Sequence, residues 1–228
     1  MTDPYLEAKR AAGRAAADLV ETGTKIGLGT GSTFVHVLQR LRERMDEEGL
    51  EVCGVPTSEG TANKARELGI PMTTLDEVEG LDLAIDGADE VDEQRTLIKG
   101  GGGALVREKI VAAAAAEMVV IVSGNKMVDR VGTTFRLPVE VLPFGWRTVA
   151  RAIDALNGAP ELRTNDGEPF VTDNGNYILD CNFGPIADPA TLERQLNMLP
   201  GVLDNGLFVG MAGRVLVGES DGTVRLLD

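Results

Sequence analysis

Histidine and cysteine, the side chains that most often bind transition metals, are scarce in this sequence. His36 is the only histidine among 228 residues, and Cys53 and Cys181 are the only cysteines. A structural zinc site takes four such ligands in a defined spacing, and no spacing of that kind occurs here. Two cysteines also cannot build the disulfide framework of a small secreted domain. The sequence therefore predicts neither a metal centre nor a disulfide scaffold.

No stretch of the chain has the length and apolar character of a membrane span. The longest apolar run, residues 110–123, is interrupted by Glu117 and is shorter than the ~20 residues that a spanning helix needs. The first ten residues do not place a basic segment before an apolar one, as a signal peptide would. We therefore expect a cytoplasmic protein with no membrane partner.

Aromatic residues and positive charge are also in short supply. Aromatics make up 4% of the chain against 43% hydrophobic residues, so the core must consist mainly of Val, Leu, Ile and Ala. Such a core suits helices packed on a buried parallel sheet. The formal net charge is -14, which repels phosphate backbones and makes nucleic acid a poor partner. Lysine occurs at only six positions, and a lysine-poor acidic surface favours adaptation to concentrated salt; an ordinary acidic cytosolic protein is the alternative.

Helix and strand patterns alternate over residues 1–130, which is the order of a parallel sheet covered on both faces. From residue 131 the pattern changes to strand, helix, strands, helix and strand, typical of a small α+β sandwich. The final segment, about 207–228, has the pattern of two or three strands that could rejoin the first sheet. We therefore predict an α/β domain of residues 1–130 plus about 207–228, into which residues 131–206 are inserted as a smaller α+β domain.

The first candidate site is a glycine-rich loop, residues 27–33, between a predicted strand and a predicted helix. Its glycines let a ligand approach the backbone, and the N–H groups and dipole of the following helix favour a phosphate. Thr30, Ser32 and Thr33 add hydroxyl donors. A dinucleotide fingerprint would need glycine in place of Ser32, and no P-loop lysine follows. The alternative is a tight turn in which Ser32 or Thr33 caps the helix.

Carboxylates and lysines follow other predicted strands. The segment DGADE, residues 86–90, ends an apolar strand, and ligands of open parallel sheets bind at that edge. Lys99 precedes four glycines, and such a run is costly to order unless its backbone packs against a ligand. Glu108 lies one turn into the next helix, and Lys126 follows the most apolar strand. Solvated turns and surface charges are the alternative for each of these groups.

The chemistry available beside the phosphate-type loop is therefore that of carboxylates, lysines and hydroxyls. His36 has polar neighbours at helical spacing, so we expect it on the polar side of its helix, away from the tip of the loop. This set of groups fits proton transfer next to a carbonyl on a phosphorylated substrate.

Taken together, the motifs resemble those of the A-type ribose-5-phosphate isomerases. Val106 departs from that family, which more often has threonine there, and Phe34 and residues 57–64 also look less typical. The matching segments, over essentially the whole chain, are GTGST (29–33), DGADE (86–90), KGGGGAL-x-REK (99–109), LPVEV (137–141), VTDNGN (171–176) and PGV-x-x-x-GLF (200–208).

The resemblance implies an isomerase that interconverts ribose 5-phosphate and ribulose 5-phosphate, in the non-oxidative branch of the pentose phosphate pathway, with no cofactor and no metal. It implies a Rossmann-like α/β domain with a smaller α+β, ferredoxin-like domain, assembled as a homodimer or a dimer of dimers. Glu108 would be the acid/base, Asp86 with Asp89 would open the sugar ring, and Lys99 with the glycine run would stabilise negative charge. The residues that match the family's substrate contacts are Lys9, Thr30, Gly31, Ser32, Thr33, Asp86, Gly87, Ala88, Asp89, Lys99, Gly100, Gly101, Gly102 and Lys126.

Two other functions remain open at this point. A sugar-phosphate sensor of the type fused to bacterial repressors would bind but not turn over, and we would expect it to carry a DNA-binding domain. An amino-sugar phosphate deaminase would be expected to open the ring with a histidine, for which His36 is badly placed. A turnover assay with ribose 5-phosphate separates these alternatives from the isomerase.

The acidic composition predicts that salt stabilises the protein. Repulsion within a net charge of -14 opposes the compact state. Salt shortens the range of this repulsion to ~10 Å at 0.1 M and ~3 Å at 1 M. We expect the melting temperature to rise markedly from dilute buffer to molar potassium chloride, while the affinity for a phosphorylated substrate weakens. A flat or falling melting temperature across the salt series would show that the acidity is only ordinary cytosolic bias.

Overall fold

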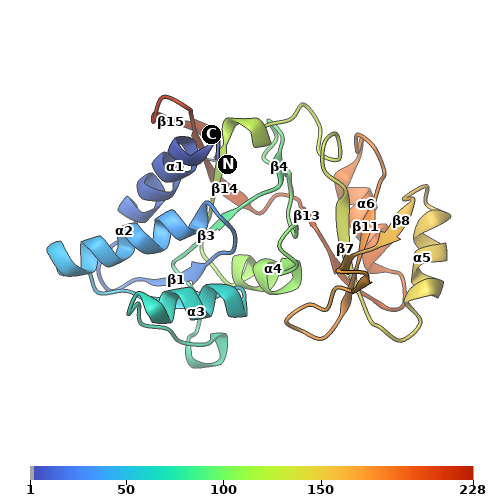
Figure 1. Ribbon diagram of the computed structural model, residues 1–228, viewed down its shortest axis with the longest axis horizontal. Helices are drawn as coiled ribbons and strands as arrows, with labels where there is room; N and C mark the ends of the chain where they lie inside the picture. The colour runs from blue at the N-terminus through green and yellow to red at the C-terminus, as the bar shows by residue number, and fades with distance from the viewer. Residues whose placement is uncertain (1–2, 228) are drawn as a thin grey trace. The chain divides into compact units, whose positions relative to one another are not determined.

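The computed structural model describes residues 3–227, which form two compact units (Figure 1). The first unit comprises residues 3–88, 107–126 and 211–227, and the second comprises residues 89–106 and 127–210. Residues 89–106, which the sequence analysis assigned to the α/β domain, thus group with the second unit. The predicted boundaries, as limits of separately folding domains, stay a prediction.

A six-stranded sheet forms the centre of the first unit, in the order β15–β14–β6–β3–β1–β2. Strands β14 to β2 all run parallel, and β15 pairs antiparallel at one edge. Because β14 pairs with β6, the C-terminal segment joins the first sheet. The strands are β1 (Lys25–Leu28), β2 (Cys53–Pro56), β3 (Leu83–Gly87), β6 (Met118–Ser123), β14 (Ala212–Gly218) and β15 (Val224–Leu227).

Helices cover both faces of this sheet. On one face, α1 and α2 pack over Ile26, Leu28 and Ile85, all fully buried. On the other face, Ala84 packs with Val111 of α4, as expected because successive strand residues point to opposite faces. This arrangement confirms the predicted Rossmann-like architecture. The helices are α1 (Leu6–Asp18), α2 (Phe34–Glu47), α3 (Glu59–Glu67) and α4 (Leu105–Ala113), with short 3-10 turns η1 (Leu75–Glu77) and η2 (Gly124–Lys126).

The second unit is built on a four-stranded antiparallel sheet in the order β12–β7–β11–β8. The chain order β7–α5–β8–β11–α6–β12 with this strand order is the ferredoxin-like arrangement, as predicted. Its core is aliphatic, with Leu137, Val139, Ile153 and Leu179 at most 1% exposed. The elements are β7 (Leu137–Val141), α5 (Trp146–Asp154), β8 (Pro160–Leu162), β11 (Tyr177–Cys181), α6 (Pro189–Asn197) and β12 (Val202–Asn205).

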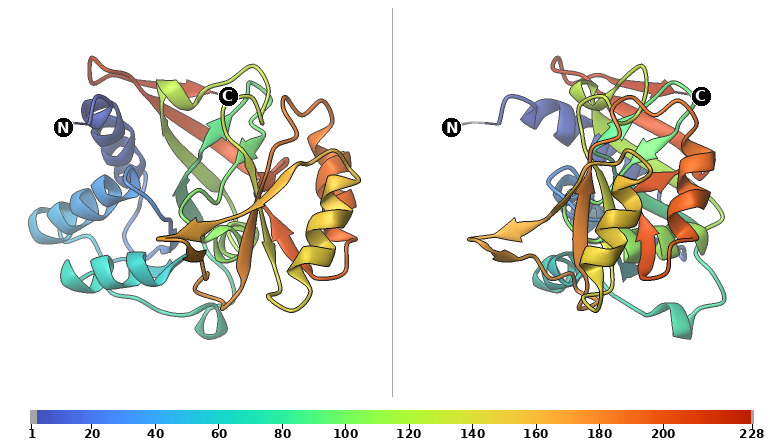
Figure 2. Two further views of the ribbon diagram at one scale, coloured as in Figure 1. Left: turned by 45° about the vertical axis from the view of Figure 1, so that its right-hand side comes forward. Right: turned by 90° about the vertical axis from the view of Figure 1, so that its right-hand side faces the viewer.

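Two smaller features complete the second unit. A three-stranded antiparallel sheet joins β13 (Leu207–Phe208), β5 (Leu97–Ile98) and β4 (Glu90–Val91). A hairpin of β9 (Thr164–Asn165) and β10 (Glu168–Pro169) projects from the four-stranded sheet (Figure 2). Between residues 3 and 227, no helix is both long and apolar enough to cross a membrane.

The carboxylate of Glu90 fastens the segment that leads into β7. Glu90 is fully buried, and its Oε1 accepts hydrogen bonds from the backbone N–H and the hydroxyl of Thr134 and from the N–H of Phe135. Its Oε2 accepts from the N–H of Gly132. Both oxygens thus meet only donors, which compensates for the cost of burying the charge.

We therefore expect Glu90→Gln to destabilise the protein by about 1–3 kcal/mol, because the amide NH2 would face backbone donors and leave them unsatisfied. Urea unfolding measures the loss, with Glu93→Gln, a change at an exposed neighbour, as the control. Equal unfolding midpoints for the two variants would show that Glu90 does not anchor this segment.

Candidate functional site

The glycine-rich loop between β1 and α2 is fastened to the carboxylate of Asp86. The N–H of Thr30 donates to Asp86 Oδ1 at 2.9 Å, and the N–H of Gly87 donates to the same oxygen at 2.7 Å. A Cβ added at Gly29 would lie 2.3 Å from Asp86 Oδ1, so only glycine permits this approach. Two motifs that lie 56 residues apart in the chain therefore meet at one sheet edge, as the strand order predicts.

Lys9 of α1 reaches the same loop. Its Nζ lies 2.9 Å from Ser32 Oγ and 2.7 Å from Asp3 Oδ2. The predicted cap of α2 is wrong: Thr33 occupies the N-cap position but makes no capping hydrogen bond, and Ser32 Oγ accepts from Lys9 instead. The first N–H groups of α2 are thus not capped by the Thr33 hydroxyl. Uncapped N–H groups at the start of a helix can bind an anion.

A cluster of buried hydroxyls that the sequence analysis missed forms hydrogen bonds to the glycine loop. Thr57, Ser58 and Thr61, which we call the hydroxyl cluster, are all less than 9% exposed. Thr61 Oγ1 donates to the carbonyl of Gly29 at 2.7 Å, and Thr30 Oγ1 lies 2.8 Å from both Thr57 Oγ1 and Ser58 Oγ. The only signal in the sequence was their position directly after β2, whose end lies beside that of β1. Residues 57–64, which look less typical of the family, therefore contribute the hydroxyls that contact the glycine loop.

A cavity of about 200 Å³ opens between the loop and the hydroxyl cluster. Phe34 and Leu38 give it an apolar wall, and Lys64, which pairs with Glu67, lies at its border. The residues around the cavity are Thr30, Gly31, Phe34, Val35, Leu38, Ser58, Gly60, Thr61 and Lys64.

Asp89 and the glycine run contact each other within the second unit. Asp89 Oδ2 accepts a hydrogen bond from the N–H of Gly101 at 2.7 Å. Lys99 is 2% exposed, with its Nζ 5.5 Å from the centre of the Phe208 ring and its backbone N–H bonded to the carbonyl of Gly206. A buried ammonium over an aromatic face retains part of the favourable interaction that it loses with water.

Glu108 lies in the first turn of α4 and is 5% exposed. The positive end of the helix dipole favours negative charge at this place. Lys126 ends η2 and is half-buried. His36 lies on α2 with its Nδ1 3.2 Å from Gln39 Oε1, on the polar side of the helix, as expected.

The structure thus assigns every predicted site residue to one of the two units. The first unit carries Lys9, Thr30, Gly31, Ser32, Thr33, Asp86, Gly87, Ala88, Glu108 and Lys126, and the second carries Asp89, Lys99, Gly100, Gly101 and Gly102. In residues 3–227, no group of three or more His, Cys, Asp or Glu side chains is arranged to hold a metal ion.

Comparison with known proteins gives one consistent family. The family model described as ribose 5-phosphate isomerase A (phosphoriboisomerase A) matches residues 53–222. The ribose-5-phosphate isomerase A of Trichodesmium erythraeum is 50% identical over 222 residues, which cover 96% of this chain and 94% of that protein. That of Chloroflexus aurantiacus is 51% identical over 216 residues, covering 94% and 90%.

Solved structures agree with this similarity. Ribose 5-phosphate isomerase A from Methanocaldococcus jannaschii superposes with a TM-score of 0.93 at 42% identity, covering 97% of this chain and 98% of that one. The isomerase from Plasmodium falciparum gives a TM-score of 0.93 at 39% identity, covering 96% and 97%. A D-ribose-5-phosphate isomerase in complex with phospho-erythronic acid gives 0.92 at 39% identity, covering 96% and 97%.

The hydroxyl cluster leads to a prediction about substrate affinity. Thr61→Val removes the hydrogen bond to the carbonyl of Gly29 and leaves that buried acceptor unsatisfied, so the glycine loop should shift. We expect KM for ribose 5-phosphate to rise about tenfold while kcat changes less. Thr73→Val, which removes an exposed hydroxyl bonded to Glu77, is the matched control. Unchanged KM in Thr61→Val would mean that the loop does not depend on the hydroxyl cluster.

Proposed function

The chain belongs to the ribose-5-phosphate isomerase A family and is an aldose–ketose isomerase, and from this premise we propose which residues carry out each step of the reaction. The observation that supports the assignment best is the contact between the glycine loop and Asp86, because it brings a phosphate-type loop to an acid/base group. This family assignment favours the isomerase over the sensor and the deaminase considered above.

The phosphate of the substrate binds to the glycine loop, residues 30–33, with Lys9 and Lys126 supplying positive charge. The location of Lys9 Nζ against Ser32 supports this role, as does the position of the loop before α2. Gly87 and Ala88, which lie between Asp86 and Asp89 in the chain, also contact the substrate. Binding energy from the phosphate then positions the reacting end of the sugar.

Ring opening requires a proton to leave the anomeric hydroxyl and another to reach the ring oxygen. Asp86 carries out this exchange with assistance from Asp89. Two N–H groups hold Asp86 Oδ1, and one N–H holds Asp89 Oδ2, so the orientation of both carboxyl groups is set before substrate binds.

Glu108 then transfers the proton between the two carbons. Its carboxylate removes the C2 proton of the open aldehyde, and the electron pair of that C–H bond forms a C1–C2 double bond while the carbonyl electrons move to the oxygen on C1. The proton of the C2 hydroxyl passes to the oxygen on C1, and return of the abstracted proton from Glu108 to C1 gives the ketone at C2 and a hydroxyl at C1. The intermediate is a cis-enediolate, and no electrons leave the substrate.

Negative charge that develops on the substrate oxygens is stabilised by Lys99 and by N–H groups of residues 100–102. Donors that are already oriented act without reorganisation at the moment of reaction, and this effect is often the largest single contribution to catalysis. The burial of Lys99 supports the role, because a charge acts more strongly away from water.

Some finer properties are also part of the proposal. We infer a homo-oligomer, dimer or dimer of dimers, working in the cytoplasm within the non-oxidative pentose phosphate pathway and needing neither a metal nor another cofactor. Light scattering coupled to gel filtration tests the oligomer, and an assay in excess chelator tests the need for a metal.

The role of Glu108 is tested by Glu108→Gln. We expect this variant to lose about 10²–10⁴-fold in kcat, because the amide cannot act as a base, while the affinity for phospho-erythronic acid and the melting temperature change little. Glu43→Gln, at a half-exposed glutamate of α2, is the control. Near-normal turnover by Glu108→Gln would overturn the assignment of the base.

A further inference from the structure

Arg163, just after β8, contacts the glycine run through its guanidinium. Its Nη1 donates to the carbonyl of Gly100 at 2.9 Å and to the carbonyl of Gly101 at 3.1 Å. The opposite edge of the guanidinium bonds both carboxylate oxygens of Asp180 on β11, through Nε at 2.9 Å and Nη2 at 2.5 Å. All of these residues belong to the second unit. One side chain therefore joins the four-stranded sheet to two consecutive peptide groups.

These contacts fix the direction of the amide groups in the run. Neighbouring carbonyls of an extended chain point to opposite sides, whereas those of Gly100 and Gly101 accept from one nitrogen and so point to the same side. The described chain contains no cis peptide bond, and in a trans peptide the N–H points opposite to the carbonyl. The N–H groups of Gly101 and Gly102 are consequently turned away from Arg163, toward a common side. Successive N–H groups in this arrangement form an anion-binding concavity.

An anionic group already occupies part of that concavity. Asp89 Oδ2 accepts from the N–H of Gly101, on the side that the peptide geometry requires. An added Cβ at Gly101 would lie 2.6 Å from Asp89 Oδ1, so the carboxylate lies directly against the backbone. The peptide between Gly100 and Gly101 is thus held at both ends, by a cation at its carbonyl and an anion at its N–H.

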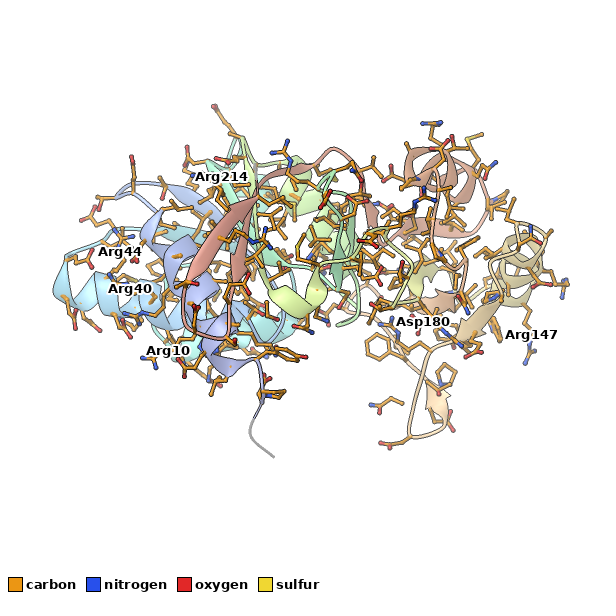
Figure 3. The ribbon with its side chains drawn as sticks, turned by 90° about the horizontal axis from the view of Figure 1, so that it is seen from above. Arg10, Arg40, Arg44, Arg147, Asp180 and Arg214 are labelled. Atoms are coloured by element: carbon orange, nitrogen blue, oxygen red, sulfur yellow. The ribbon has the colours of Figure 1, made fainter. Side chains whose placement is uncertain are left out.

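Asp180 and Phe170 hold the side chain and the backbone of Arg163 in place. The side chains of Arg163 and Asp180 are 14% and 23% exposed. Figure 3 shows Asp180 near the base of the segment that carries β9 and β10. The centre of the Phe170 ring lies 5.8 Å from the guanidinium carbon, and the N–H of Phe170 donates to the carbonyl of Arg163. An arginine fork can make all of these contacts at once, whereas a lysine offers a single point charge.

We propose that Arg163 is a positioning residue for the isomerisation: it orients and polarises the two peptides of residues 100–102, so that the N–H of Gly101 holds Asp89 and the N–H of Gly102 stabilises the negative charge of the enediolate. A charged donor at each carbonyl also strengthens the N–H of the same peptide as a donor, because hydrogen bonds in a chain polarise one another. The proposal rests on the role assigned above to the glycine run. Arg163 itself acts only through these peptides.

Four variants test the proposal on the full-length protein. Arg163→Gln removes the cation, Arg163→Lys keeps the charge without the fork, and the double variant Arg163→Gln/Asp180→Asn avoids leaving the half-buried carboxylate of Asp180 unpaired. Arg136→Gln is the matched control, because Arg136 lines the same surface cavity as Arg163 and Asp180, one of about 510 Å³, but pairs with the exposed Glu161 instead of the glycine run. For each protein the melting temperature, kcat, KM for ribose 5-phosphate, and inhibition by phospho-erythronic acid and by inorganic phosphate are measured.

We expect Arg163→Gln and the double variant to lose about tenfold to a hundredfold in kcat, the scale of a misplacement near 1 Å, with KM within about threefold. Inhibition by phospho-erythronic acid, whose carboxylate spreads negative charge over two oxygens as the enediolate does, should weaken by a similar factor. Inhibition by inorganic phosphate should not change. Arg163→Lys should retain an intermediate kcat, and Arg136→Gln should behave as the wild type.

A spectroscopic measurement separates positioning from general loosening. In protein labelled with ¹⁵N-glycine, the amide proton of Gly101 should shift upfield in Arg163→Gln, because its hydrogen bond to Asp89 weakens when the carbonyl of its peptide loses the cation. The amide of Gly222, in a turn of the other unit, should not move.

Three results would overturn the proposal. A lower melting temperature with unchanged kcat would make Arg163 purely structural. A parallel loss of affinity for inorganic phosphate would mean that the phosphate site itself is disturbed, and an unmoved Gly101 amide would show that the peptides are not oriented by Arg163. Lys99→Ala separates this failure from that of the premise: if Lys99→Ala also keeps full kcat, the stabilising role of the glycine run is wrong, whereas loss in Lys99→Ala alone counts only against Arg163.

Discussion

Hydrogen bonds from backbone N–H groups to the carboxylates of one five-residue segment are the constraint on which the site depends. Asp86 accepts from Thr30 and Gly87, Asp89 accepts from Gly101, and Glu90 accepts from the segment before β7. Each bond is charge-assisted and therefore stronger than a neutral one. The segment also crosses from the first unit to the second, between Ala88 and Asp89. One short stretch thus orients the glycine loop in one unit and the glycine run in the other.

Ion pairs at the surface and beside the glycine run differ in their exposure to water. Arg40 on α2 pairs with Asp18, Glu43 and Glu48, partners that are at least 41% exposed, and such pairs contribute little because water screens them. Arg163 and Asp180 are more protected, and their fork geometry sets a direction as well as a charge. The arginines of this acidic protein therefore act in two ways. Those on the surface offset part of its negative charge, and Arg163 makes oriented contacts with the glycine run.

Much of the fold and of the candidate site followed from local pattern. Apolar strands such as β6 and the alternation of strand with helix indicated the parallel sheet, and the glycine loop, DGADE and the glycine run marked its ligand edge. The cap of α2 was wrong because Lys9, far away in the chain, takes the Ser32 hydroxyl. The hydroxyl cluster and Arg163 were missed because their residue types are ordinary and only their partners make them important.

The sequence by itself determined which chemistry is available: carboxylates, lysines and a phosphate-type loop, most of which follow a predicted strand. Burial of apolar surface enforces that placement, because strand periodicity and turn residues are local properties of the chain. The tertiary structure alone decided which way the polar groups point. Gly100 and Gly101 have no side chains from which the direction of their peptides could be predicted. Arg163, more than 60 residues away in the sequence, turns their carbonyls to one side. Orientation depends on partners far apart in sequence, and no local pattern encodes it.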